Sequence, residues 1–259
     1  MIPMFIVTFL QFLMVRIVDE FKDYEEDCKY RPYRPVPRGL IKLKELKILF
    51  IICIILQLIL TITCSQNGIL YLIILWVFFA LMSKGFFIKK ILDKHLLLEV
   101  TLDELILPIM ILYLANFIPQ IYLNYNSSVD FAITNSIIMV DSNIWKILVM
   151  TYIISWIVEV ARKIRCKEDE EEGVKTYTAI LGIGKAMGLI FVLETLLMLV
   201  QGIILGQKNY IWILALYILA NIPNILFAKK KTRKMAKLAE LSANIYIAIV
   251  YCSLVILIL

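Results

Sequence analysis

Three aspartates recur at four-residue intervals near the start of the chain. Asp19, Asp23 and Asp27 have the spacing that places side chains on one face of an α-helix. Stacked carboxylates repel one another, and a divalent cation turns that repulsion into binding. Mg²⁺ typically takes one or two carboxylates together with the phosphate oxygens of a substrate. The three aspartates therefore predict a metal site, and the alternative interpretation is a solvated helix end.

A run rich in arginine and proline follows the aspartates directly. It contains Arg31, Arg34 and Arg38, and it ends at Gly39. Guanidinium groups suit phosphate oxygens because they donate paired hydrogen bonds, and the prolines stiffen the backbone that carries them. An aspartate series beside an arginine run predicts a site for an anion carried on a divalent metal, above all a diphosphate.

A second charged cluster covers residues 159–173. Glu159 and Lys163 form an i, i+4 pair in the favourable order, and Arg162 lies between them. Taken alone, the cluster has a simple interpretation as a basic helix C-terminus followed by a solvated acidic run. If a diphosphate binds at the first cluster, the second cluster is expected to form the opposite wall of that site.

The composition predicts an integral membrane protein built from helices. Of the 259 residues, 61% are hydrophobic and only 19% are charged, whereas a soluble domain is about 45–50% apolar. The apolar runs are continuous rather than alternating, which favours helices over an outer-membrane barrel. Eight membrane spans are expected, at roughly residues 1–18, 48–64, 68–82, 102–123, 144–160, 183–205, 209–228 and 241–259.

The basic residues predict which side of the membrane each loop occupies. If the spans alternate, every Lys and Arg except Lys146 and Lys208 lies on the side of the three aspartates. The positive-inside rule makes that side cytoplasmic, and the excess of basic residues requires no nucleic-acid partner. Both termini then lie outside. The first span has no charged flank before it, so we expect a further helix upstream rather than a signal peptide.

Four polar stretches are long enough to form structure outside the membrane, at residues 19–47, 83–101, 161–182 and 229–240. The last of these is basic and is expected to be a surface segment that contacts acidic lipid. The first and third stretches each mix acidic with basic residues before a glycine. We expect one domain over residues 1–259.

The first cluster resembles the first aspartate-rich motif of the UbiA superfamily of intramembrane prenyltransferases. That motif reads Asn/Asp-Asp-x-x-Asp-x-x-x-Asp and precedes an Arg-Pro-x-Pro-x-Gly segment. Here Asp19, Glu20, Asp23 and Asp27 stand at the motif positions, and residues 34–39 form the arginine–proline segment.

The second cluster carries a further part of the resemblance, which covers essentially the whole chain. Gly173, Thr176 and Gly182 resemble the segment after the second motif of that superfamily. In this register Asp169 stands at one aspartate position of the second motif, but Arg165 stands at the other. The second metal site is then either rebuilt around Glu159 or degraded, and a catalytically inactive relative stays a possible interpretation.

The resemblance implies nine membrane helices around a central apolar cavity that is capped by cytoplasmic loops. It also implies Mg²⁺-assisted ionisation of a prenyl diphosphate and transfer of the isoprenyl group to a hydrophobic, aromatic or lipid acceptor. The catalytic residues are predicted to be Asp23, Asp27 and Lys163. The diphosphate is predicted to contact Arg31, Arg34, Arg162 and Lys163. The predicted metal ligands are Asp19, Asp23, Asp27, Glu159 and Asp169.

Other functions were weighed against prenyl transfer. A membrane cation-binding or transport protein requires charged residues near the midplane, and only Glu194 falls there. A CDP-alcohol phosphotransferase is disfavoured because its Asp-Gly-x-x-Ala-Arg core is absent. The five cysteines show no paired spacing that indicates a disulfide framework or a zinc site.

Overall fold

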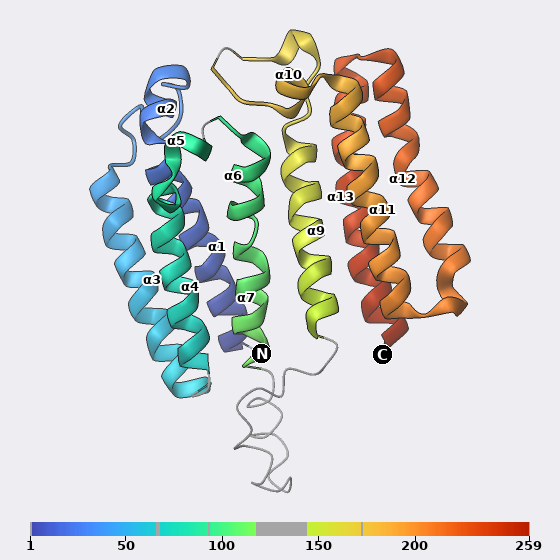
Figure 1. The fold of residues 1–259 in the computed structure, drawn as a ribbon. Helices are drawn as coiled ribbons and strands as arrows, with labels where there is room; N and C mark the ends of the chain where they lie inside the picture. The colour runs from blue at the N-terminus through green and yellow to red at the C-terminus, as the bar shows by residue number, and fades with distance from the viewer. Residues whose placement is uncertain (1, 66–67, 93, 118–143, 172, 259) are drawn as a thin grey trace, which may run out of the picture. The chain divides into compact units, whose positions relative to one another are not determined.

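The computed structural model describes residues 2–65, 68–92, 94–117, 144–171 and 173–258. All regular elements within these ranges are helices, and none of these residues forms a strand. Six of the helices are long and apolar enough to cross a membrane. The predicted class, a polytopic helical membrane protein, is confirmed. The chain divides into two compact units, Met1–Ser142 and Asn143–Leu259, and Figure 1 shows the helices of each.

Within the described residues, the first unit contains seven α-helices and one 3-10 turn. In chain order the elements are α1 (Ile2–Lys22), α2 (Tyr24–Tyr30), α3 (Leu43–Cys64), α4 (Gly68–Ser83), η1 (Gly85–Phe87), α5 (Lys89–Leu92), α6 (Leu96–Asp103) and α7 (Ile106–Ala115). Helix α1 packs against α3 and α4, and α4 packs against α7. Met14, Leu72 and Tyr113 are fully buried where these helices meet.

Helix α3 shows the burial pattern of a helix that faces lipid. Its buried residues are Cys53, Gln57 and Thr61, whereas Ile51 and Ile55 are about half exposed. Gln57 Oε1 and the Thr61 hydroxyl each find a partner inside the unit, whereas the amide nitrogen of Gln57 has none among the described residues. The indole of Trp76 donates to Gln57 Oε1 at 3.1 Å, and the hydroxyls of Thr61 and Tyr113 lie 2.6 Å apart. Polar groups turned inward and isoleucines turned outward are what a hydrocarbon solvent requires.

The second unit is built around four long helices. Its elements are α9 (Ile144–Arg162), η3 (Lys167–Asp169), α10 (Tyr177–Leu181), α11 (Ile183–Leu205), η4 (Gln207–Asn209), α12 (Tyr210–Lys230) and α13 (Arg233–Ile258). Helix α11 packs against both α9 and α12, and α12 packs against α13. Ile157, Ile190, Leu197 and Phe227 are fully buried among these helices.

The membrane spans differ from the prediction in two places. The expected span over 102–123 begins at the end of α6 and continues as the ten-residue α7, and residues 118–123 lie outside the described part. The stretch 229–240 was expected to separate two spans, but only two residues lie between α12 and α13, so the last helix begins at Arg233 rather than at residue 241. The expectation of a single domain over the whole chain stays a prediction.

The physical reason for the second difference is a regular spacing of small residues. Ala236, Ala239 and Ala243 recur at helical intervals and are all buried, so α13 packs on that face while its lysines stay in solvent. The charged residues in the same stretch lower its average hydropathy, so a hydropathy profile does not place a packed helix there.

Candidate active site

The three aspartates of the first cluster lie on successive turns of a nearly continuous helix. Helix α1 ends at Lys22 and α2 begins at Tyr24, yet the i to i−4 bonding continues across the junction. The N–H of Asp23 donates to the carbonyl of Asp19 at 2.9 Å, and the N–H of Asp27 donates to that of Asp23 at 2.8 Å. The predicted helical spacing of the three side chains is therefore present in the structure.

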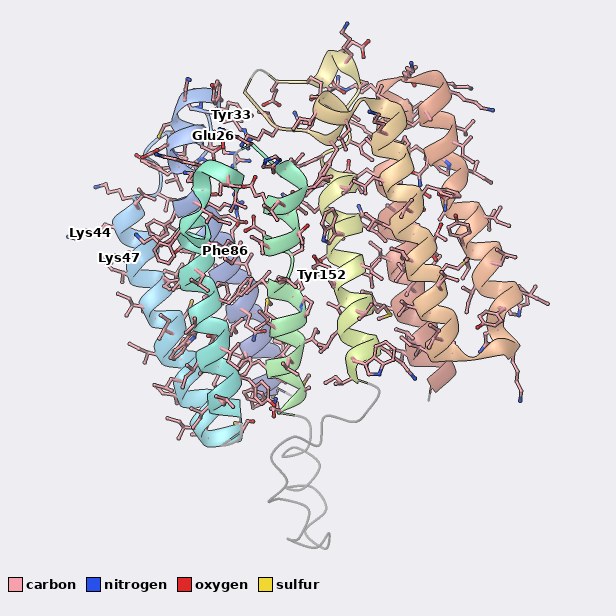
Figure 2. The ribbon with its side chains drawn as sticks, in the orientation of Figure 1. Glu26, Tyr33, Lys44, Lys47, Phe86 and Tyr152 are labelled. Carbon is pink, nitrogen blue, oxygen red and sulfur yellow. The ribbon has the colours of Figure 1, made fainter. Side chains whose placement is uncertain are left out.

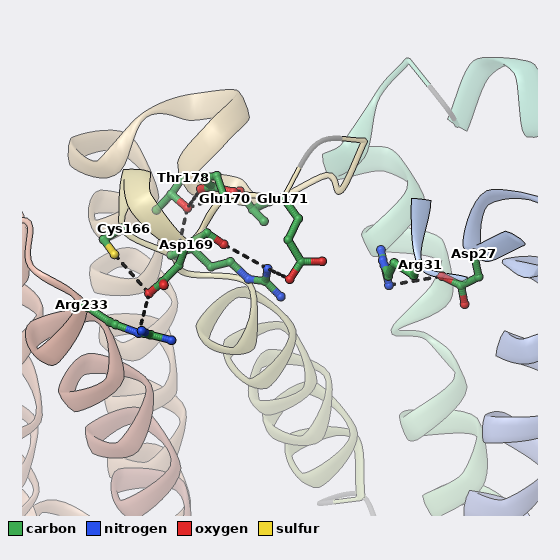
Figure 3. Close-up of polar contacts among 10 residues, drawn as sticks. Asp27, Arg31, Cys166, Asp169, Glu170, Glu171, Thr178 and Arg233 are labelled. Atoms are coloured by element: carbon green, nitrogen blue, oxygen red, sulfur yellow. Dashed lines mark hydrogen bonds and ion pairs between the residues drawn. The ribbon is translucent and has the colours of Figure 1, made fainter. Parts of the chain in front are cut away.

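Asp27 is buried, with an exposed fraction of 2%, and two arginines neutralise its carboxylate. Nη1 of Arg34 donates to Oδ2 at 2.6 Å, and Nη1 of Arg31 lies 3.4 Å from Oδ1. Helix α2 ends at Tyr30, because Arg31 precedes Pro32 and a proline disfavours helical geometry in the residue before it. The turn that follows returns Arg34 to the carboxylate. Figure 3 shows the contact between Asp27 and Arg31.

Lys22 fastens the end of α1 to α6. Its ammonium lies 2.5 Å from Oδ2 of Asp103 and 3.0 Å from Oε1 of Glu99. Asp103 is also within electrostatic reach of Asp23. The first cluster is therefore held against a helix that lies about eighty residues further along the chain. Lys22 therefore pairs with carboxylates of α6.

Glu159 in the second unit repeats the arrangement of Asp27. Its side chain is buried, and its two carboxylate oxygens pair with two different cations. Nζ of Lys163 lies 2.5 Å from Oε1, which confirms the predicted i, i+4 pair, and Nε of Arg162 pairs with Oε2. The sequence predicted that these residues would lie together at the end of α9, and the structure places them there.

In the loop after α9, two threonine hydroxyls are hydrogen-bonded to one glutamate side chain. The hydroxyls of Thr176 and Thr178 donate to the two carboxylate oxygens of Glu170 at 2.6 and 2.7 Å. The N–H of Arg165 donates to Thr178 Oγ1 at 3.0 Å. Thr176 also caps α10 by accepting from the N–H of Ala179. Sequence reasoning missed this network, although a threonine just before a short helix is a recognisable N-cap pattern.

The two positions of the second motif carry opposite charges. Oδ2 of Asp169 lies 3.1 Å from Nε of Arg233 and accepts from the thiol of Cys166 at 3.2 Å. Nη1 of Arg165 lies 2.9 Å from Oε1 of Glu171. Figure 3 shows these contacts. Burial, together with the neighbouring carboxylates, raises the pKa of the Cys166 thiol. Asp169 and Arg165 are therefore each engaged with a partner of opposite charge.

The donor set can be compared with what Mg²⁺ requires. The described residues contain no group of three or more His, Cys, Asp or Glu side chains that is arranged to hold a metal ion. Mg²⁺ needs only one or two carboxylates when a substrate supplies phosphate oxygens. Asp19 and Asp23 are half-buried on successive turns, so they fit as that pair. Both oxygens of Asp27 already contact arginine.

Comparisons with known proteins show the family and the fold. Residues 1–248 match the UbiA prenyltransferase family, and no curated protein matches the chain. The fold is similar to a solved structure from work on the biosynthesis of digeranylgeranylglyceryl phosphate synthase in membranes, with a TM-score of 0.63 and 19% identity. That alignment covers 99% of this chain and 84% of the other. Because the family match spans nearly the whole chain, the protein belongs to the UbiA prenyltransferase family.

Proposed function

We propose that the protein transfers an isoprenyl group from a prenyl diphosphate to an aromatic or lipid acceptor, with Mg²⁺ assisting the ionisation. The observation that supports this most strongly is the first cluster. Two aspartates lie on successive helical turns, and a third aspartate gathers two arginines beside them. Carboxylates for a metal and guanidinium groups for phosphate oxygens are the two components that a bound diphosphate needs.

The three aspartates have different roles in this proposal. Asp19 and Asp23 would hold Mg²⁺, which when bound supplies positive charge at the diphosphate oxygens. Asp27 has both oxygens in ion pairs with Arg31 and Arg34. We therefore assign Asp27 the task of orienting these two guanidinium groups toward the diphosphate, in place of the direct metal contact expected from the motif.

The chemistry follows from charge. The bond between the allylic carbon and the diphosphate oxygen breaks heterolytically, and the diphosphate leaves with the electron pair. Arg31 and Arg34 stabilise the negative charge that develops on it, most strongly in the transition state. A nucleophilic atom of the acceptor then bonds to the allylic carbon and releases a proton. The apolar interior between the helices keeps water away from the carbocation.

The second cluster contributes fixed positive charge to the same diphosphate in this proposal. Arg162 and Lys163 are held by Glu159, as Arg31 and Arg34 are held by Asp27. Asp169 is engaged by Arg233. We accordingly assign Glu159 and Asp169 the role of holding cations, and Lys163 the role of contacting the diphosphate. A second metal would require these ion pairs to open.

Turnover by the purified full-length chain tests the proposal. The protein is incubated in detergent with radiolabelled prenyl diphosphates of several chain lengths, an aromatic or lipid acceptor, and Mg²⁺. The expected result is diphosphate release that depends on Mg²⁺ and falls on the order of 100-fold or more in Asp23→Asn, because one carboxylate of the metal pair is lost. Product analysis then identifies the acceptor and the chain length.

Glu26→Gln is the matched control. Glu26 lies in α2, three residues after Asp23, and is exposed; Figure 2 labels its side chain. This substitution removes the same charge close to the site and is expected to leave turnover unchanged. Equal turnover in wild type, Asp23→Asn and Glu26→Gln would remove the assignment of the first cluster.

A further inference from the structure

Four polar side chains are buried together in the middle of α11, α12 and α13. We call them the Glu194 cluster: Glu194 from α11, Asn221 and Asn224 from α12, and Tyr246 from α13. Their exposed fractions are 0%, 3%, 2% and 2%. Prenyl transfer as proposed above makes no use of them, and each lies in a helix long enough to span a membrane. An ionisable residue at such a depth is expensive and marks a functional site.

Several oxygens of the Glu194 cluster have no hydrogen-bond partner among the described residues. The amide nitrogen of Asn224 donates to Glu194 Oε2 at 3.3 Å and to Asn221 Oδ1 at 3.4 Å. Asn221 itself donates to the carbonyl of Tyr217 at 3.0 Å. The remaining oxygens, Glu194 Oε1, Asn224 Oδ1 and the hydroxyl of Tyr246, have no hydrogen-bond partner in the described part of the chain. Buried polar atoms of native proteins are normally satisfied, so this set requires a ligand.

The charge of the cluster is also unbalanced. Within the described residues, no Lys, Arg or His forms an ion pair with Glu194, and the ion pairs of the two charged clusters lie near helix ends or in loops. The amide nitrogen of Asn224 donates to one oxygen of Glu194, and the other oxygen has no partner among the described residues. A buried carboxylate without a cation is strongly unfavourable. One positive charge is therefore needed to complete the cluster.

The remaining oxygens form no hydrogen bond with one another. Tyr246 lies within electrostatic reach of Glu194, yet its hydroxyl is not hydrogen-bonded to the carboxylate. A proton on Glu194 would neutralise the charge but would serve only one acceptor. A metal ion contacts several oxygens at once. Pro223 lies inside α12 beside Asn224 and has no N–H, so the carbonyl one turn earlier loses its helical donor.

We propose that the Glu194 cluster binds one monovalent cation of the Na⁺ type. All the open ligands are hard oxygens, which suit Na⁺, and the single carboxylate matches a single positive charge. A divalent ion would leave an excess positive charge in the apolar interior. This inference is independent of the proposed prenyl transfer, and either can fail without the other.

Thermal unfolding of the purified full-length protein tests the site. The unfolding midpoint is measured at increasing NaCl, KCl or choline chloride, with the ionic strength held constant. A ligand that binds only the folded state raises stability with the logarithm of its concentration above Kd. We expect the midpoint to rise with Na⁺ relative to choline, and this Na⁺ response to disappear in Glu194→Gln.

Glu240→Gln is the matched control, because Glu240 lies in α13 outside the cluster; it should keep the Na⁺ response. If Glu194→Gln does not fold, Tyr246→Phe removes one oxygen only and should shift the response to several-fold higher Na⁺. Equal midpoints for wild type in NaCl and choline chloride would overturn the proposal. So would a Na⁺ response that persists in both cluster variants. A pH-dependent midpoint that is identical in all three salts would assign the site to a proton and likewise reject Na⁺.

Discussion

At the scale of single residues, the two charged clusters use the same device. A buried carboxylate, Asp27 in one unit and Glu159 in the other, holds two cations that follow it closely in the sequence. Removing one partner of a buried ion pair is destabilising, because the remaining charge is left uncompensated. The carboxylates therefore fix where the cations can act. Their own contacts are with these cations, so in our proposal they position the cations and do not contact the diphosphate themselves.

Asp27→Asn should affect both stability and turnover. The substitution keeps the size of the side chain but removes the charge that holds Arg31 and Arg34. We expect the free energy of unfolding to fall by about 1–3 kcal/mol, as for lost hydrogen bonds to charged groups. We also expect kcat/KM for the prenyl diphosphate to fall on the order of 10- to 100-fold, because the arginines are less well oriented. Thermal unfolding in detergent and steady-state kinetics measure the two effects.

The control for this prediction is again Glu26→Gln, which should change stability by less than about 0.5 kcal/mol, as is usual for an exposed position. If Asp27→Asn behaves like Glu26→Gln in both assays, Asp27 does not orient the arginines.

Cys166 should be much less reactive than Cys28. Cys166 is buried and its pKa is raised by burial and by the adjacent acids, whereas Cys28 is exposed. A higher pKa leaves less thiolate at a given pH, and thiolate is the reactive form. We expect a maleimide to modify Cys166 at least about tenfold more slowly than Cys28 at neutral pH. Peptide mass spectrometry over a time course measures both rates, and equal rates would mean that the loop after α9 is open in solution.

At the scale of elements, most of the fold could be predicted from apolar runs because a bilayer requires long continuous stretches. Five of the expected spans, at 1–18, 48–64, 144–160, 183–205 and 209–228, fall on long helices. The last span was predicted to begin at residue 241, whereas α13 begins at Arg233. The first turns of α13 carry both charged residues and buried alanines, and the charges lower the hydropathy of this stretch. A helix shorter than the usual span, such as α4, is also found by hydropathy because it is apolar throughout.

The site could be predicted in part. The spacing of Asp19, Asp23 and Asp27 is a local helical property, so the sequence was sufficient for it. The contact between Asp27 and Arg34 depends on the turn after α2, and the pairing of Lys22 with Asp103 depends on tertiary packing. Neither can be read from spacing. Glu194 was noticed because a charge in an apolar run is conspicuous, whereas its partners on α12 and α13 required the structure.

Gly182 should be intolerant of a side chain for reasons of backbone geometry alone. It joins α10 to α11 with φ +79° and ψ 156°, a region that is essentially restricted to glycine. A Cβ at this position would meet no heavy atom within 4 Å, so no steric clash complicates the result. Gly182→Ala should lower the free energy of unfolding by about 1–3 kcal/mol.

Gly188 provides the matched comparison within α11. A Cβ there also meets no atom within 4 Å, and its φ lies outside the positive range. Gly188→Ala should stabilise the protein by about 0.5–1 kcal/mol, because alanine loses less backbone entropy in a helix. Thermal unfolding of both variants measures the contrast. The same sign of effect for the two substitutions would refute the backbone explanation.

At the scale of the whole molecule, the chain combines two compact units, and each carries one charged cluster near the end of a membrane helix. The basic residues lie mostly on the predicted side of these clusters, and on that basis we propose that both clusters face the cytoplasm. Membership of the UbiA prenyltransferase family supports our proposal that the ligand is a prenyl diphosphate. The central claim is that both clusters bind it, the first through a metal and the second through side-chain cations.

Binding of a prenyl diphosphate analogue that cannot ionise tests this claim most directly, because it separates ligand binding from turnover. Its Kd is measured with and without Mg²⁺ for wild type, Asp23→Asn and Lys163→Gln. We predict that Mg²⁺ strengthens binding to wild type and that Asp23→Asn abolishes this Mg²⁺ dependence. Lys163→Gln should weaken binding but leave its Mg²⁺ dependence intact. Wild-type affinity that is the same with and without Mg²⁺, or a Kd unchanged in Lys163→Gln, would contradict the account.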